Sequence, residues 1–190
     1  MNILEAWIKK YGQIIILVLG LPCTNKSEIA KELGLDLDLP IIKINDFLIE
    51  AKYKEIKVKE LKFKVYEDSD NYDWVKLNSN INELKKKGII LYGNYLDTSK
   101  IDFNIDFSFF YSMNQKLCKK MLIEKKMIEW GETDDQTQIY FENVFNPLYD
   151  ELKKNLSINK FFNIKEDTTF DNSYDELFKL LMELIEKKLK

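Results

Sequence analysis

The feature that most limits the possible folds is a set of short apolar runs, each followed by a helical pattern. The first run is QIIILVLG at 13–20, which is rich in β-branched residues and ends in glycine. Strands buried on both faces have this composition, and helices alternating with them indicate a parallel sheet. Similar runs are PIIKI at 40–44, IILYG at 89–93, FSFFYS at 107–112 and KFFNI at 160–164. The pattern predicts an α/β fold with a five-stranded parallel sheet flanked by helices.

The segments between these runs have the spacing of amphipathic helices. One helix is predicted to begin at Lys26 and to end at Gly34, and residues 45–61 are predicted to return to helix. Further helices are expected over 74–88, 114–129, 139–156 and 173–190, and a short amphipathic segment over 1–10. The length of 190 residues fits one domain spanning residues 1–190.

Composition excludes several classes of site. The chain has no histidine, and all 29 basic residues are lysine, so imidazole bases, histidine-bound metals and arginine clamps are all absent. A net charge of −3 makes nucleic-acid binding an unlikely function. No apolar run is long enough for a membrane span, and no signal peptide is recognisable. Two cysteines favour reduced thiols in a cytoplasmic compartment.

The segment GLPCTNKS at 20–27 lies where the first strand meets the first long helix. It differs by one residue from the phosphate-binding pattern G-x-x-x-x-G-K-[ST], because Asn25 stands in place of the second glycine. Such a loop would bind ATP through backbone N–H groups, with Lys26 on the outer phosphates and Ser27 on Mg²⁺. Asparagine tolerates left-handed backbone angles, so we expect Asn25 to preserve the loop. In the alternative, Ser27 merely caps a helix.

Two further strand-to-helix junctions carry candidate site residues. Asp46 follows the second strand, where a carboxylate would accept a proton from a substrate hydroxyl or orient Mg²⁺. Asp73 would accept hydrogen bonds from ribose hydroxyls, and Tyr72 would stack on a base. Each has a simpler alternative: both aspartates are helix N-caps, and Tyr72 belongs to the core.

Lysines concentrate in one stretch after the fourth strand, at positions 116, 119, 120, 125 and 126. A mobile basic lid that closes over a triphosphate would have this composition. The alternative is a solvated helix face, in which Cys118 is buried rather than catalytic.

Taken in order, these segments resemble the uridine kinase and nicotinamide riboside kinase family over residues 13–187. GLPCTNKS is similar to its phosphate loop, IIKINDFL to a strand ending in Asp-Asp-Phe, NYDW to a Tyr-Asp pair, and YFENVFNPLY to a riboside-kinase segment. The resemblance implies a P-loop nucleoside-kinase fold, a lysine-rich helical lid at about 114–139, ATP and Mg²⁺ as cofactors, and a small-molecule nucleoside as substrate.

The resemblance also implies a role for each matching residue. The ATP-binding residues would be Gly20, Cys23, Thr24, Asn25, Lys26, Ser27, Lys119 and Lys120. Tyr53, Tyr72 and Asp73 would bind the nucleoside, Ser27 and Asp46 the metal, and Asp46 and Lys26 would be catalytic.

The chain departs from this family at positions that the family uses to bind ATP and Mg²⁺. Asn25 replaces a glycine, Tyr92 replaces a strand-end glutamate, and lysines stand where the lid has arginines. Loss of an arginine that stabilises a transferring phosphoryl group lowers the rate by about 10³-fold or more. A second hypothesis is therefore a degenerate kinase fold that serves as a binding or structural module. Its protein partner would contact exposed aromatic residues such as Trp7, Phe161 and Phe162. The identity of the nucleoside is left open.

Overall fold

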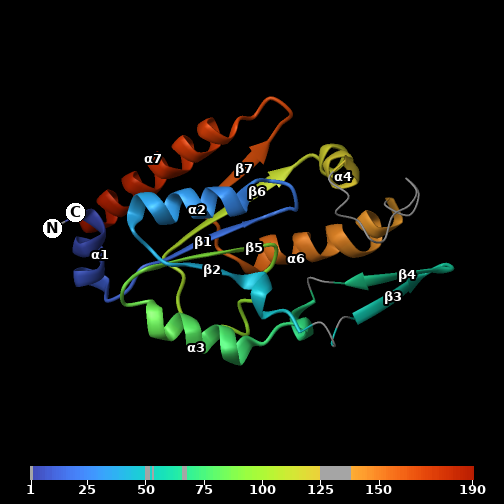
Figure 1. Ribbon diagram of the computed structural model, residues 1–190, viewed down its shortest axis with the longest axis horizontal. Coiled ribbons are helices and arrows are strands. Elements are labelled where there is room, and N and C mark those ends of the chain that lie inside the picture. Colours follow the sequence, from blue (N-terminus) through green and yellow to red (C-terminus); the bar gives the residue numbers. More distant parts are fainter. Residues whose placement is uncertain (1, 50–51, 53, 66–67, 125–137) are drawn as a thin grey trace.

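The computed structural model describes residues 2–49, 52, 54–65, 68–124 and 138–190 (Figure 1). Its centre is a parallel sheet with the strand order β2-β5-β1-β6-β7. The strands are β1 Ile15–Gly20, β2 Ile41–Lys43, β5 Ile89–Gly93, β6 Phe107–Met113 and β7 Lys160–Ile164. All five predicted strands and their parallel arrangement are confirmed.

Helices cover both faces of this sheet and create two hydrophobic cores. They are α1 Ile3–Tyr11, α2 Lys26–Leu37, α3 Trp74–Leu84, α4 Gln115–Glu124, α6 Asn146–Asn155 and α7 Phe170–Leu189. Helices α2 and α7 pack on one face, and α3 and α6 on the other (Figure 1). The helix predicted over 139–156 is confirmed despite Pro147, since proline lies in the first turn of α6, directly after a π-helical turn at Phe141–Phe145. Within the described ranges, none of the helices combines the length and apolarity that crossing a membrane requires.

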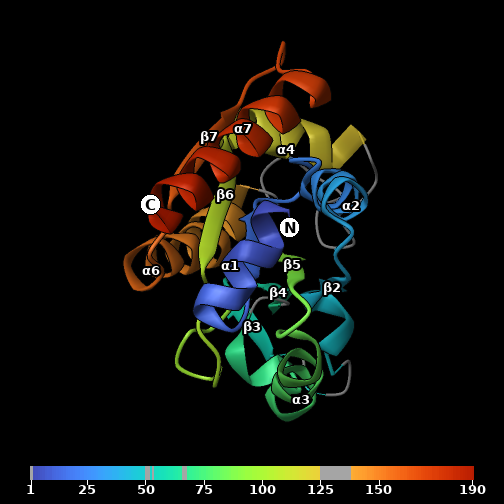
Figure 2. The ribbon, with the colours of Figure 1, turned by 90° about the vertical axis from the view of Figure 1, so that its left-hand side faces the viewer.

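Helix α1 closes the end of the sheet opposite the candidate site, where both chain termini lie (Figure 2). Lys10 Nζ and Tyr11 Oη each donate a hydrogen bond of 2.8 Å to the carbonyl oxygen of Lys188 in α7. Trp7 and Phe162 are buried, so the proposed partner surface is wrong for these two side chains. Phe161 alone of the three is exposed, with 45% of its surface accessible.

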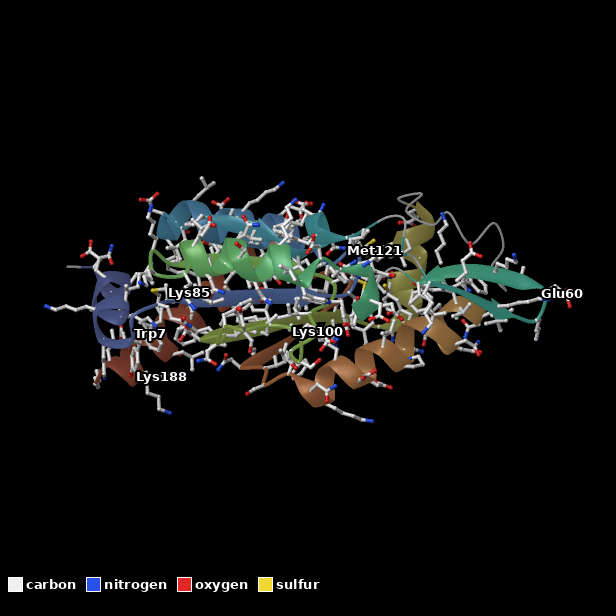
Figure 3. The ribbon with its side chains drawn as sticks, turned by 90° about the horizontal axis from the view of Figure 1, so that it is seen from below. Trp7, Glu60, Lys85, Lys100, Met121 and Lys188 are labelled. Atoms are coloured by element: carbon white, nitrogen blue, oxygen red, sulfur yellow. The ribbon has the colours of Figure 1, made fainter. Side chains whose placement is uncertain are left out.

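The helix predicted over 45–61 is wrong. A short 3-10 helix, η1 (Ile44–Phe47), follows β2, and β3 (Lys54–Val58) and β4 (Leu61–Val65) then form an antiparallel hairpin. The reason is a period of two in KEIKVKELKFKV, in which apolar side chains point to the core and lysines to solvent. In Figure 3, Glu60 marks the hairpin tip, at the opposite end of the molecule from Trp7.

Gly34 does not end the second helix, contrary to the prediction. Helix α2 continues to Leu37, and Asp38 ends it in a left-handed conformation with φ 52°. A Cβ atom at Gly34 would lie 2.6 Å from Cδ1 of Ile41. Gly34 therefore lets α2 pack closely against Ile41 of β2 and does not act as a helix stop.

Candidate functional site

The phosphate-type loop lies at the carboxyl end of the central strand β1, where ligands gather in open α/β sheets. Cys23 has φ 64° and Asn25 has φ 57°, so both adopt left-handed backbone angles. The prediction that Asn25 would take the glycine conformation is confirmed. Thr24 is buried, and its Oγ1 donates a 2.7 Å hydrogen bond to the carbonyl oxygen of Leu21. Local contacts thus shape the loop.

Gly20 allows this loop to pass close to the neighbouring strand. The N–H of Leu21 donates to the carbonyl oxygen of Tyr111 in β6 at 2.9 Å. A Cβ at Gly20 would lie 2.6 Å from that same oxygen and 2.9 Å from Thr24 Oγ1. Only glycine fits this approach without moving backbone atoms.

Lys26 and Ser27 form the first turn of α2, beside the loop. Lys26 Nζ donates a 3.1 Å hydrogen bond to the carbonyl oxygen of Leu21, so the ammonium group lies over the loop. Ser27 Oγ donates to Glu28 Oε2 at 2.8 Å. The capping alternative for Ser27 is wrong, because the cap position is Asn25, whose side chain makes no capping bond. Backbone N–H groups, a positive charge and a hydroxyl therefore converge at one helix N-terminus.

Asp46 lies within η1, at the end of β2, and its side chain is exposed. It is therefore not the N-cap that one alternative proposed. Its Oδ1 is 3.6 Å from Nζ of Lys43, a solvent-exposed ion pair that contributes little stability. Burial raises the pKa of the Tyr92 phenol, and the negative charges of Asp46 and Glu28 raise it further. Asp46 and Glu28 therefore both lie within electrostatic reach of the strand-end residue Tyr92.

These side chains supply the oxygen ligands that Mg²⁺ prefers. Ser27 offers a hydroxyl, and Asp46 and Glu28 offer carboxylates, while Mg²⁺ bound with a nucleotide takes its other ligands from phosphates and water. Among the described residues, no three acidic or cysteine side chains form a metal cage of their own. The donor set therefore fits a metal that arrives with a phosphate ligand.

Tyr72 and Asp73 take the simpler of their two predicted roles in this conformation. Asp73 is the N-cap of α3, and its Oδ1 accepts a 3.0 Å hydrogen bond from the N–H of Lys76. The ring of Tyr72 is 4% exposed and packs between Trp74 and Tyr95, with centroid distances of 5.1 and 6.1 Å. Stacking of a base on Tyr72 would therefore require the ring to move. Tyr53, the third predicted nucleoside contact, lies outside the described residues.

Helix α4 packs beside the phosphate-type loop and carries the two lysines predicted to contact ATP. Cys118 Sγ, in the same helix, approaches the carbonyl oxygen of Pro22 at 3.8 Å. Lys120 Nζ is 3.2 Å from Glu166 Oε1, in the segment that follows β7. Residues 125–137 of the predicted lid lie outside the described residues.

Sequence reasoning missed a cavity of about 640 Å³ between α4 and the end of β7. It is lined by Asn114, Lys116, Leu117, Lys120, Asn163, Ile164, Lys165 and Glu166. Leu117 and Ile164 supply apolar surface to this cavity, and three lysines and Glu166 supply charged groups. The only signal in the sequence was the charged pair Lys165-Glu166 directly after the fifth apolar run.

Comparison with known proteins supports the fold. No family model matches the chain, and no curated protein matches its sequence. Many solved structures are similar to this chain along most of their length, and they include the three that follow. Shikimate kinase from Bacteroides thetaiotaomicron has a TM-score of 0.55 and 15% identity, over 90% of this chain and 99% of that one. Thymidylate kinase from Candida albicans has a TM-score of 0.56 and 14% sequence identity, over 94% of this chain and 94% of that one. A putative fructose transport system kinase from Silicibacter sp. TM1040 has a TM-score of 0.56 and 12% sequence identity, over 85% of this chain and 99% of that one.

At these identities the likeness shows the fold, which is the P-loop kinase fold. The uridine kinase and nicotinamide riboside kinase family is not singled out among these neighbours.

Proposed function

We propose that the chain is a phosphotransferase that moves the terminal phosphoryl group of ATP to a hydroxyl group of a small molecule. The finer proposal is that the acceptor is the 5′-hydroxyl of a ribonucleoside. One observation carries the proposal: a glycine-started loop with left-handed Asn25 leads from the central strand into a helix that begins with Lys26 and Ser27. The names of the structural neighbours support kinase chemistry in general and leave the acceptor open.

On this proposal, the residues of the candidate site divide the work of binding and phosphoryl transfer among them. The loop N–H groups and the N-terminus of α2 bind and orient the phosphates. The side chain of Lys26, which donates a hydrogen bond to the carbonyl oxygen of Leu21 in this structure, would turn to the outer phosphates. Lys119 and Lys120 would add positive charge from α4. Asp46 would accept the proton of the attacking hydroxyl. Ser27 and Asp46 would hold Mg²⁺, which when bound neutralises charge on the phosphates.

The cavity beside α4 would receive the base of ATP, because it lies next to the helix that contacts the loop at Pro22. Catalysis in this class is mostly positioning and electrostatics, so a chain without arginine keeps part of the apparatus. Lysine supplies charge without the bidentate geometry of arginine, and slower turnover is expected.

A degenerate fold that binds a partner without catalysis is the second candidate. The residues that favour it are Asn25, whose side chain occupies space that glycine leaves open, and Tyr92, which replaces a carboxylate with a phenol. Among the aromatic residues suggested for a partner surface, Phe161 is the exposed one. On this hypothesis the loop is a remnant of the fold, and ATP does not bind.

Calorimetry with Mg²⁺-ATP separates the two candidates. We expect the natural chain to bind, and Lys26→Ala to lower affinity by about 10- to 100-fold, as for loss of a charge-assisted hydrogen bond. Lys31→Ala, which removes an exposed lysine further along α2, is the matched control and should bind normally.

Phosphorylation of uridine, cytidine and nicotinamide riboside is then measured, with Asp46→Ala as the inactive control. Absence of binding at millimolar ATP would reject the kinase function, and normal turnover by Asp46→Ala would reject the role of Asp46.

A further inference from the structure

The two cysteines of the chain are distant in sequence, but Cys23 lies in the phosphate-type loop and Cys118 lies in α4, which packs beside that loop. Cys118 Sγ lies 3.8 Å from the carbonyl oxygen of Pro22, and the carbonyl carbon of Pro22 is bonded to the backbone nitrogen of Cys23. Burial raises the pKa of the Cys118 thiol to about 12; Cys23 raises it further and Lys26 opposes both. Each thiol therefore lies within electrostatic reach of the other, and both are unoxidised.

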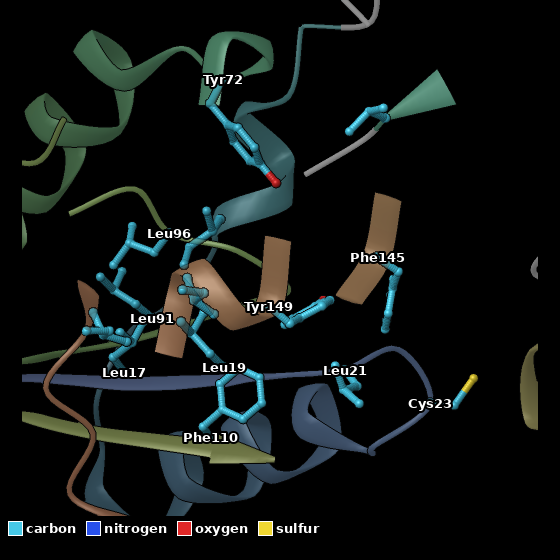
Figure 4. Close-up of a cluster of buried hydrophobic side chains, with 14 of the residues drawn as sticks. Leu17, Leu19, Leu21, Cys23, Tyr72, Leu91, Leu96, Phe110, Phe145 and Tyr149 are labelled. Carbon is cyan, nitrogen blue, oxygen red and sulfur yellow. The ribbon is translucent and has the colours of Figure 1, made fainter. Parts of the chain in front are cut away.

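The two thiols differ in their burial and in the conformation of their backbone. Cys118 is fully buried in α4, where its N–H donates to the carbonyl oxygen of Asn114 at 2.9 Å. Cys23 is 9% exposed and lies in the loop at φ 64°, which non-glycine residues rarely adopt. Figure 4 shows its sulfur pointing away from Leu21, within the hydrophobic cluster to which Cys23 also belongs. A change of backbone angles at Cys23 would relieve strain, so this is the side that can move.

We propose that Cys23 and Cys118 are an oxidation site, where a peroxide converts the two thiols into one intramolecular disulfide. Cys23, the more accessible thiol, loses its proton and its sulfur attacks a peroxide oxygen; the O–O bond breaks, a sulfenic acid forms, and the departing hydroxide takes up the proton as water. The Cys118 sulfur then attacks the Cys23 sulfur, and the S–OH oxygen leaves with the Cys118 proton as a second water. The two thiols lose two electrons and two protons, and the peroxide is reduced to water.

The bond would tie the loop to the helix that carries Lys119 and Lys120. Because Cys23 contributes its backbone to the curve of the loop, a pull towards α4 turns the neighbouring N–H groups out of their phosphate-binding arrangement. Oxidation would thus lower affinity for nucleotide, and bound nucleotide would disfavour the disulfide at equilibrium by the same free energy. This consequence rests on the proposed function, whereas formation of the disulfide does not.

The test uses the full chain, reduced and then treated with hydrogen peroxide. Intact-mass spectrometry should show the loss of two hydrogen atoms from the monomer, and both titratable thiols should disappear together. Cys23→Ser and Cys118→Ala serve as the variants, and circular dichroism confirms that each is folded. Neither should lose two hydrogens as a monomer, and dithiothreitol should restore the natural chain.

Nucleotide affinity is measured before and after oxidation, and should fall by about tenfold or more, within the usual range of coupling between two sites. Retention of both thiols, a disulfide between two chains, or the same mass change in Cys118→Ala would overturn the proposal. If the disulfide forms but reduced protein never binds ATP, the proposed kinase function fails and the oxidation site stands. If ATP binds equally before and after oxidation, the proposed distortion of the loop by the disulfide is refuted.

Discussion

The two halves of the candidate site are built in different ways. The phosphate half, the loop between β1 and α2, is shaped by contacts within a few residues, such as the hydrogen bonds from Thr24 and Lys26 to Leu21, and it meets distant residues through the backbone of Leu21 and Pro22. The other half, which the proposed function assigns to the acceptor, comprises the described residues among 44–73, between β2 and α3. This acceptor half is held by contacts with distant parts of the chain. Phe63 packs on the ring of Tyr140 at 5.8 Å, and Ser69 and Tyr72 contact residues after β5.

This difference predicts which property a substitution in each half should change. A change in the phosphate half alters a few local contacts, so its main effect should be on ligand affinity, except where backbone atoms collide. A change in the acceptor half removes tertiary packing, so its main effect should be on the free energy of unfolding. The predictions below test this division, from the largest expected effect to the smallest.

Phe63→Ala should be the most destabilising of these changes. The side chain is 2% exposed and joins the hairpin to the core through Tyr140, so its loss should lower the free energy of unfolding by about 3–5 kcal/mol. Urea denaturation measures this. The control is Lys62→Ala, an exposed neighbour that should change stability by less than about 0.5 kcal/mol. Equal, small effects of both variants would mean that the hairpin is not part of the cooperative fold.

Gly20→Ala and Gly93→Ala probe the two halves, because Gly20 leads into the phosphate half and Gly93, at the end of β5, packs against Ile44 and Asn45 of the acceptor half. At Gly20 the new Cβ would meet a backbone oxygen at 2.6 Å, whereas at Gly93 it would meet Ile44 Cβ at 3.0 Å and Asn45 Oδ1 at 3.1 Å. We expect Gly20→Ala to destabilise by about 2–3 kcal/mol, as for an overpacked core, and Gly93→Ala by less. Thermal unfolding of both variants tests the order, and the reverse order would contradict the geometry at Gly20.

The sheet was predictable because its signals are local. The three central strands, β1, β5 and β6, come from apolar runs that are almost entirely buried, and burial on both faces leaves little choice of structure for such runs. The edge strands β2 and β7 are more exposed. The hairpin was not predicted, because its alternating lysines also fit a polar helix when the period of two is overlooked. Its position depends on Phe63 meeting Tyr140, a contact between residues far apart in the chain.

The site was predictable to a similar degree. A short motif specifies the loop, and left-handed Asn25 follows from the preference of that residue type. Neither the approach of Cys118 to Pro22 nor the cavity between α4 and β7 has a local signal, since both depend on how distant segments pack. For Tyr72 and Asp73, sequence offered two roles, and packing in this structure favours the structural ones.

Asp73→Ala should lower the free energy of unfolding by about 1 kcal/mol, the usual effect of losing an N-cap. Asp73→Asn keeps the cap and should leave stability nearly unchanged. Nucleoside affinity of the Asn variant therefore isolates the substrate role. A loss of affinity in Asp73→Asn without a loss of stability would support a contact with ribose. Unchanged affinity would leave Asp73 with its capping role alone.

Asn25→Gly should have the smallest effect on stability. Glycine relieves the left-handed strain at φ 57° but adds freedom to the unfolded chain, and these two effects of about 0.5–1 kcal/mol each oppose one another. Asn25→Ala gains no such relief and should destabilise by about 1 kcal/mol. If the asparagine side chain crowds the phosphate position, Asn25→Gly should bind Mg²⁺-ATP several-fold more tightly in calorimetry, at the same unfolding midpoint. Unchanged affinity would show that Asn25 is a full substitute for glycine, so that weak activity would have to originate from Tyr92 or from the lysines of α4.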